Sequence, residues 1–216
     1  MVEVKLLSWS QGLVRDPRRL VLLAIKISAG KVKLKGLEHY LSEYPESKLG
    51  SWVAEAWRFP SVLEHVVFSF YIEGISRVTS HQLVRHRLAS YTQESQRYSA
   101  AEASVVVPKT VERGEKARRI FEEVVAQSMD AYEKLLSLGI PYEDARYVLP
   151  QAIKTRLLMT VNLRELIHIA CLRLSKDAQW EIREVVKRMV EEASKVVPEV
   201  TQLIERMCKS EEGGKA

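Results

Sequence analysis

Residues 85–99 read RHRLASYTQESQRYS and concentrate side chains that could bind a charged small molecule. Arg85, His86 and Arg87 come first, and Arg97 follows a run of hydroxyl and amide side chains. A guanidinium donates two parallel hydrogen bonds to a phosphate and keeps its charge at ordinary pH. Hydroxyls and amides could bind a ribose and the edge of a base. A solvated loop after a helix end, where cations are also favoured, has the same composition, so both interpretations stay open.

The elements that must position this segment are expected on both sides of it. Alternation predicts a strand at VEVKLLSW (2–9), and β-branched and aromatic residues predict a second at HVVFSFYI (65–72). Pro17 can open a helix through RRLVLLAIKIS (18–28), and a second helix is expected at 46–58. A helix through SRVTSHQLVRHR (76–87) would end on the three polar residues, and ASVVVP (103–108) would form a short strand.

The second half of the chain is predicted to be mostly helical. An apolar i, i+3, i+4 stripe begins after Glu112 and is ended by Gly139 and Pro141; it comprises Ala117, Ile120, Phe121, Val124, Val125, Met129, Leu135 and Leu136. Pro141 can begin another helix, which Pro150 would interrupt. Asn162-Leu-Arg-Glu165 resembles a capping box and predicts a helix over 163–174. A final helix over 178–207 should bend or break near Pro198.

These elements predict an α+β fold with a mixed or antiparallel sheet flanked by several long helices. The chain has 216 residues and no evident linker, so we expect one domain over 1–216 with a frayed tail at about 209–216.

Composition limits the classes of function. The net charge of +5 favours anionic partners such as nucleotides, but the basic residues are spread along the chain. Aromatic residues make up only 7% and are not interleaved with them, which argues against a nucleic-acid partner. No apolar run is long enough to span a membrane, and no signal peptide is evident, so we expect a cytoplasmic protein without a membrane partner.

The cysteines and histidines do not form a metal-binding or disulfide pattern. Cys171 and Cys208 are the only cysteines, and their spacing predicts neither a disulfide framework nor a zinc site. A metal hydrolase using His65, His81 and His86 would be a rival, but no HExxH motif is present. No metal is therefore expected.

With these elements in place, the quoted segment resembles the signature of the flavin-dependent thymidylate synthases. That signature reads Arg-His-Arg, two residues, Ser, one residue, Asn, two residues, Ser, one residue, Arg. The chain matches it at Arg85, His86, Arg87, Ser90, Ser95 and Arg97. Further blocks are similar in the expected order: SVLEH (61–65), ARYVLP (145–150), TVNLREL (160–166) and LRLSKDAQWEI (172–182). The resemblance therefore covers roughly residues 55–185.

Three positions depart from the family pattern. Thr92 replaces the Asn of the signature, so it is assigned no ligand contact. Phe59 stands where members often have His, and any flavin-side role of that His must be absent or supplied otherwise. His168 stands where many members carry Asn; an imidazole can still donate or accept one hydrogen bond.

The resemblance implies the fold of the family and its reaction. That reaction methylates dUMP to dTMP, with 5,10-methylenetetrahydrofolate as the one-carbon donor and NADPH as the reductant acting through FAD. The FAD-binding positions it implies are Ser61, Arg85, His86, Arg87, Gln93, Asn162, Arg164 and His168. Those for dUMP are Gln82, Arg85, Gln93, Glu94, Ser95, Gln96, Arg97, Arg146 and Arg173.

Arg173 matches the arginine thought to favour ionisation of the uracil at N3, which implies a catalytic role; otherwise it is a surface arginine near a helix end. Arg164 and His168 should share one helix face, and Asn162 and Arg173 another. One subunit could not easily direct both faces at one ligand, and the family builds its sites from several subunits of a homotetramer. A non-catalytic nucleotide- or nucleic-acid-binding protein remains the alternative.

Overall fold

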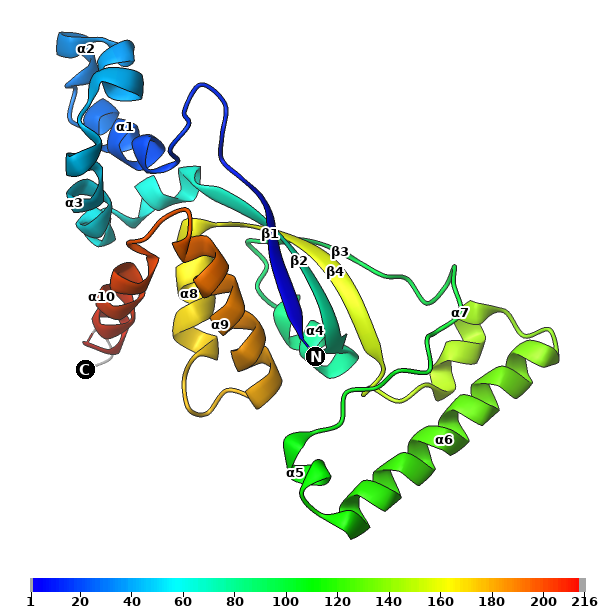
Figure 1. Ribbon diagram of the computed structural model, residues 1–216. Coiled ribbons are helices and arrows are strands. Elements are labelled where there is room, and N and C mark those ends of the chain that lie inside the picture. The colour runs from blue at the N-terminus through cyan, green and yellow to red at the C-terminus, as the bar shows by residue number, and fades with distance from the viewer. Residues whose placement is uncertain (1, 214–216) are drawn as a thin grey trace.

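A four-stranded antiparallel sheet organises the chain in the computed structural model, which describes residues 2–213 (Figure 1). The strands β1 (Glu3–Trp9), β2 (Val67–Ser76), β3 (Ser90–Gln93) and β4 (Lys154–Asn162) lie in the order β1-β2-β4-β3. The two central strands, β2 and β4, pair from Val67 opposite Asn162 to Ser76 opposite Lys154. Its register shifts beside Gly74, whose φ of 71° favours glycine. The α+β class is confirmed, and the sheet is antiparallel rather than mixed.

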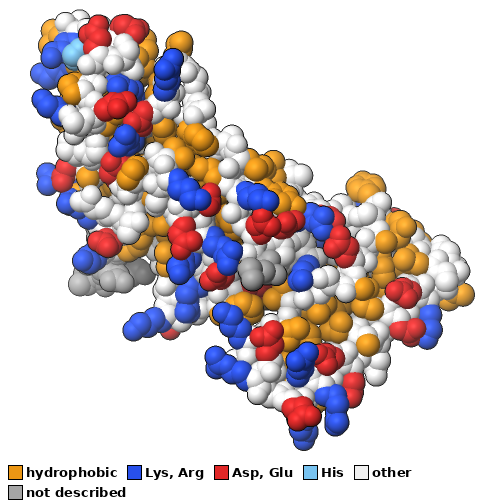
Figure 2. Space-filling view, in the orientation of Figure 1, with side chains coloured by type: hydrophobic (Ala, Val, Ile, Leu, Met, Phe, Trp, Pro, Cys, Tyr) orange, Lys and Arg blue, Asp and Glu red, His pale blue; other side chains and the backbone are white. Residues whose placement is uncertain are grey.

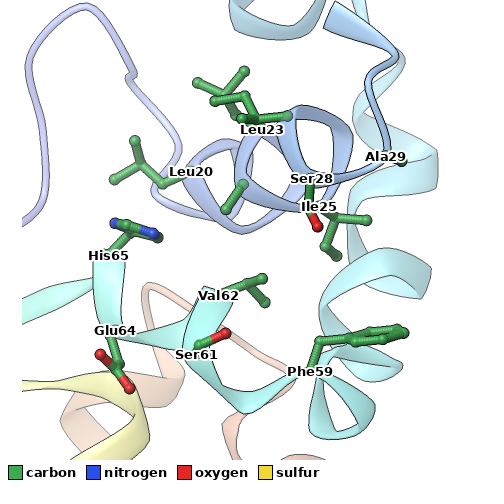
Figure 3. Close-up of a pocket in the computed structure, with 12 residues that line it drawn as sticks. Leu20, Leu23, Ile25, Ser28, Ala29, Phe59, Ser61, Val62, Glu64 and His65 are labelled. Carbon is green, nitrogen blue, oxygen red and sulfur yellow. The ribbon is translucent and has the colours of Figure 1, made fainter.

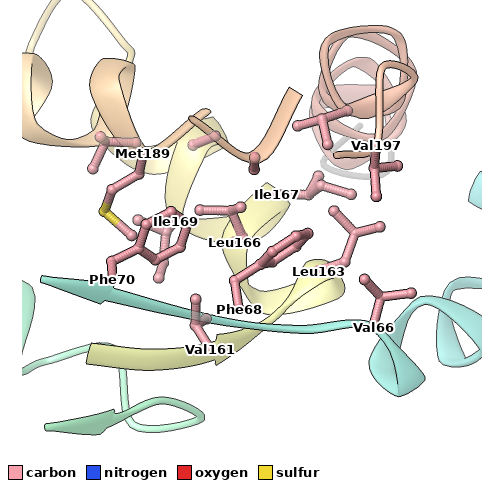
Figure 4. Close-up of a cluster of buried hydrophobic side chains, with 14 of the residues drawn as sticks. Val66, Phe68, Phe70, Val161, Leu163, Leu166, Ile167, Ile169, Met189 and Val197 are labelled. Atoms are coloured by element: carbon pink, nitrogen blue, oxygen red, sulfur yellow. The ribbon is translucent and has the colours of Figure 1, made fainter. Parts of the chain in front are cut away.

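Helices cover one face of this sheet. The helices α8 (Leu163–Arg173) and α9 (Trp180–Ser194) lie across it, and α10 (Val200–Gly213) packs beside α8. Alternate residues of β2 and β4 point towards them, as a half-covered sheet requires. Figure 4 shows Phe68, Phe70 and Val161 beneath α8 and Met189, all essentially buried. Each such side chain contributes about 1.5–3 kcal/mol by leaving water.

The remaining helices form two outlying groups. The helices α1 (Arg18–Ser28), α2 (Val32–Lys35) and α3 (Leu49–Ala54) have a small core of their own, made by Leu22, Tyr40 and Leu49. The helix α4 (Arg77–Leu83) follows β2 directly. The helices α5 (Lys109–Glu112), α6 (Glu115–Ser137) and α7 (Tyr142–Ala145) project from the other end of the sheet as an arm (Figure 1). In the described chain, no helix is both long and apolar enough to cross a membrane.

Most predicted elements are present, but four details were wrong. The segment 46–58 is broken into short helical turns around α3, and 103–108 contributes only the single bridge between Val105 and Ile153. Both β4 and β3 were missed. The bend or break predicted near Pro198 is confirmed as a complete break between α9 and α10. Of the tail expected to be frayed, α10 includes the residues up to Gly213, and 214–216 lie outside the described residues.

The two cysteines form a disulfide, contrary to the prediction from their spacing. Cys171 in α8 and Cys208 in α10 have Cα atoms 5.3 Å apart and are bonded. Their pairing depends on the packing of α10 against α8, which spacing along the chain does not reveal.

Basic and acidic side chains are interspersed on the face of the molecule in Figure 2, as the sequence predicted.

The apolar stripe of α6 is different from the other helix faces. Its residues form the predicted helix, yet only Tyr132 of α6 is buried, and Ile120 and Val124 are more than half exposed. The arm therefore presents an amphipathic helix whose apolar side is only partly covered by its own chain.

Candidate active site

The Arg-His-Arg segment lies in the turn between α4 and β3. Helix α4 ends at Leu83, and the amide of His86 donates to the Leu83 carbonyl over 3.1 Å. The hydroxyl of Tyr91 donates to the carbonyls of Leu83 (2.8 Å) and His86 (3.1 Å). The prediction that the helix extends through Arg87 was wrong, because the chain must turn to pair β3 with β4.

The second element of the site begins where β4 becomes α8. Asn162 ends the strand and caps the helix: its side-chain oxygen accepts a hydrogen bond from the Glu165 amide over 2.8 Å. The predicted cap is therefore confirmed. It leaves Arg164 and His168 exposed and turns the Glu165 side chain into the protein, where it is 6% exposed.

These two elements enclose a cleft of about 900 Å³, which we call the inner cleft. Six of the predicted cofactor-binding residues line it: Arg85, His86, Arg87, Asn162, Arg164 and His168. Arg173, the predicted catalytic residue, lines it as well. The cleft extends along α8 from its cap to its last residue, so residues of both predicted faces of α8 line it.

Charged side chains in the inner cleft are held by specific partners. Arg164 forms an ion pair with Glu64. The Nε of Arg173 donates to Nε2 of His86 over 3.0 Å, and its Nη2 lies 3.5 Å from the Gln82 carbonyl oxygen. Gln82 therefore contributes its backbone here rather than its amide. Burial, with repulsion from Arg173 and His168, lowers the pKa of His86 to about 4.

A second group of predicted residues lies at the base of the arm. Arg97 Nε donates to a carboxylate oxygen of Glu143 over 3.0 Å, and Arg146 Nε donates to the Glu143 carbonyl over 3.0 Å. We call Arg97, Glu143 and Arg146 the outer arginine cluster. Arg97 and Glu143 are each about half exposed, at 51% and 48%. The hydrogen bond from Arg97 to Glu143 raises the pKa of Arg97, so this guanidinium stays charged.

The polar run between the two groups is only partly free to bind a ligand. The amide nitrogen of Gln93 donates to Ser80 (3.0 Å) and Thr155 (3.1 Å), so it is engaged within the protein. Glu94 lies 3.4 Å from Arg156. Ser95 accepts a hydrogen bond from the Arg97 amide, and Gln96 lines a small pocket with Glu94.

Ser61 lies apart from both groups, in a separate groove of about 830 Å³ between α1 and the turn at Pro60–His65. Figure 3 shows Leu20, Leu23 and Val62 around this groove, which is mostly apolar. Phe59, where members of the family often have His, is 62% exposed at its edge. Glu64 lines this groove and the inner cleft, so the two adjoin.

Sequence reasoning did not identify three acidic contacts of the site: Glu64 pairs with Arg164, Glu143 pairs with Arg97, and Glu165 faces His86. Glu165 was noted only as part of the capping box, and neither Glu64 nor Glu143 lies near its arginine in the sequence. No local signal could have identified these pairs. Among the side chains that the structure describes, no three His, Cys, Asp or Glu residues are placed to hold a metal ion together.

Comparison with known proteins gives the same assignment as the motifs. Residues 7–199 match the family described as thymidylate synthase complementing protein. A flavin-dependent thymidylate synthase from Sulfurisphaera tokodaii is 40% identical over 210 residues, which span 96% of this chain and 79% of that protein. Another from Geobacter sulfurreducens is 43% identical over 188 residues, 86% of this chain and 81% of that one.

A solved structure shares the fold. The UMP/dUMP methylase PolB from Streptomyces cacaoi, bound with 5-Br dUMP, superposes with a TM-score of 0.81 over 95% of both chains. At 22% identity this likeness concerns the fold alone. The matched residues include the Arg-His-Arg turn, β4, α8 and the outer arginine cluster. The family match covers most of the sequence, and two synthases are at least 40% identical to the chain over most of its length. The chain therefore belongs to the flavin-dependent thymidylate synthase family.

Proposed function

We propose that the protein is a flavin-dependent thymidylate synthase that methylates dUMP to dTMP. Its one-carbon donor is 5,10-methylenetetrahydrofolate and its reductant is NADPH, acting through FAD. The observation that carries the proposal is the gathering of Arg85–Arg87, Asn162, Arg164, His168 and Arg173 around one cleft in a member of this family.

The residues of the inner cleft fit FAD. Arg85, Arg87 and Arg164 bring three guanidinium groups to its wall, and the diphosphate of FAD requires such donors. The cleft is also within the size range of cofactor sites. When bound, FAD supplies the hydride for the reduction. Asn162 and His168 complete the polar wall, and Ser61 in the adjoining groove extends it.

The protein's own task in the reaction is to bind and polarise the pyrimidine. Arg97 and Arg146 hold the phosphate of dUMP, and the segment 93–96 with Arg85 and the Gln82 region completes the nucleotide site. Arg173 faces the uracil and stabilises the negative charge that develops when N3 loses its proton. A cysteine nucleophile is not available, because Cys171 and Cys208 are joined to each other.

We also propose that the enzyme is a homotetramer. Two observations support an assembly of copies: the site residues lie in three separate places on one chain, and part of the apolar stripe of α6, including Ile120 and Val124, is exposed. Light scattering should give four times the mass of 24.7 kDa. A monomer that binds FAD stoichiometrically would remove this part of the proposal.

The function is tested by absorbance. Purified protein should carry FAD or bind it stoichiometrically, with the two visible bands of an oxidised flavin. Reduced enzyme should then be reoxidised when dUMP and 5,10-methylenetetrahydrofolate are added without oxygen, and dTMP should form. If the protein does not bind FAD in a titration but does bind nucleotides, it is the alternative, a non-catalytic nucleotide-binding protein.

A further inference from the structure

Two ionisable side chains at the back of the inner cleft are almost fully buried. His86 and Glu165 are each 6% exposed. The Nδ1 of His86 lies 3.9 Å from a carboxylate oxygen of Glu165, and its Nε2 lies 3.0 Å from Nε of Arg173. The imidazole therefore lies between an acid and the arginine that faces the uracil in the proposed reaction.

The hydrogen bond to Arg173 fixes the protonation of the ring. An arginine Nε always carries its hydrogen and can only donate, so Nε2 of His86 accepts. A neutral imidazole then carries its proton on Nδ1, the nitrogen that faces Glu165. Burial is the largest cause of the low pKa of His86, about 4, so the ring is neutral at ordinary pH. Burial also raises the pKa of Glu165.

The backbone around the ring is held separately. The amide of His86 is bonded to Leu83, and its carbonyl accepts from Tyr91. The side chain is thus not needed to fix the turn, and both of its nitrogens face ionisable groups of α8. His168, also on α8, contributes repulsion, and Arg85 and Arg87 flank His86 in the chain.

We propose that His86 and Glu165 are positioning residues for Arg173. Glu165 lies 3.9 Å from Nδ1, beyond hydrogen-bonding distance, and favours the Nδ1-protonated form electrostatically. The Nε2 atom of His86 holds the guanidinium by its Nε. The planar fork of Arg173 is then fixed at Nε and, by the contact of Nη2 with the Gln82 carbonyl oxygen, at one terminal nitrogen, which leaves Nη1 to the uracil. Carboxylate–histidine pairs fix functional groups in this way at other sites. This inference rests on the proposed function.

The test uses the FAD-loaded enzyme with saturating folate and measures kcat and KM for dUMP. His86→Leu removes the acceptor, and kcat should fall about ten- to a hundredfold, the range for partners that orient a functional group, with KM nearly unchanged. His86→Gln keeps an oxygen that can accept from Nε and should recover part of the loss. Glu165→Gln should lower kcat less than His86→Leu. His81→Leu, at an exposed histidine of α4, is the matched control and should behave as wild type.

A double-mutant cycle separates positioning from packing. In an Arg173→Ala background, His86→Leu should cause no further loss of kcat, because its effect passes through the missing side chain. If the losses of kcat from Arg173→Ala and His86→Leu multiply in the double variant, the inference is overturned. It is also overturned if His86→Leu loses activity only because it no longer binds FAD. Flavin absorbance and the melting temperature check folding. If His86→Leu does not fold, wild-type kcat in both His86→Gln and Glu165→Gln overturns it. A wild-type protein without dUMP-dependent turnover would instead remove the proposed function, and this inference with it.

Discussion

The inner cleft and the outer arginine cluster both hold arginines that the proposed function assigns to one nucleotide, but they hold them differently. In the inner cleft, Arg173 is bonded to a buried imidazole that in turn faces a buried carboxylate. In the outer cluster, Arg97 is paired with Glu143 on the surface, where both side chains are about half exposed. One arginine is fixed by the protein interior, and the other is held by a pair that water screens.

This difference indicates a division of work. A donor that is fixed before the reaction begins needs no reorganisation when charge develops, so it can lower the barrier. An exposed ion pair is worth about 0–1 kcal/mol and is easily exchanged for a ligand. The inner arginine is therefore suited to the transition state, and the outer arginines are suited to binding the phosphate, whose charge is constant throughout.

The largest effect is expected at the inner arginine. Arg173→Ala should keep FAD and its colour but lose about 2–4 kcal/mol of transition-state stabilisation, as for an oxyanion-type donor. Arg173→Lys should recover only part, because a point charge cannot reproduce the planar fork. The measurement is dUMP-dependent reoxidation of the reduced flavin with folate present. A wild-type rate for Arg173→Ala at saturating dUMP would mean that Arg173 is only a surface charge.

The outer arginines should show the opposite kinetic pattern. Arg97→Ala or Arg146→Ala should raise KM for dUMP about tenfold or more, because a hydrogen bond to a charged group is worth about 1.5–3 kcal/mol. The value of kcat should change little, since the lost contact is made equally in ground and transition states. Arg118→Ala is the control, because Arg118 forms a similar exposed pair with Glu122 on α6. A fall in kcat at saturating dUMP would break the division between the two regions.

A smaller effect concerns stability in acid. The folded-state pKa of His86, about 4, lies below its ordinary 6.5, so between these values the unfolded chain binds a proton that the folded chain does not. This group therefore lowers stability as pH falls through that window. The raised pKa of Glu165 acts in the opposite direction, and His86→Gln removes only the first contribution. On acidification the melting temperature of wild type should fall more than that of His86→Gln, by about 2–4 °C for each kcal/mol. Parallel curves would show that His86 is not buried in its neutral form.

The smallest effect is expected on KM for dUMP when the acidic partner of Arg97 is changed. Glu143→Gln removes the carboxylate that competes with phosphate for Arg97, so KM for dUMP should fall by no more than about fivefold, the value of a surface pair. Glu122→Gln on α6 is the matched control and should leave KM unchanged. An increase in KM would show that Glu143 orients Arg97 for the ligand rather than competing with it.

Features with a local cause could be predicted from the sequence, and those that depend on pairing could not. The cap at Asn162 and the helix α6 follow from residues three or four positions apart. The strand β3 has the polar sequence SYTQ and is a strand only because β4 lies beside it. The strand β4 was missed because its apolar centre, LLM, is too short to distinguish from part of a helix.

The same limit applies to the site. Family motifs indicated the arginines, and the structure brings most of the inner set together around α8. The partners that give these arginines different properties, Glu143 and Glu165, come from other segments and depend on the tertiary structure. Motif spacing alone also assigned these residues to two faces of α8, and it could not show that one cleft follows the helix lengthwise past both sets.

The bond between Cys171 and Cys208 makes residues 172–207 a closed covalent loop that contains the whole of α9. Closing a loop with a sequence separation of 37 lowers the entropy of the denatured chain, worth about 4 kcal/mol on the chain-entropy model. A protease that cuts the connection between α8 and α9 would therefore leave two fragments that run together on a denaturing gel and separate only after reduction. The segment that carries Arg173 would remain tied to the C-terminal helix through such a cut.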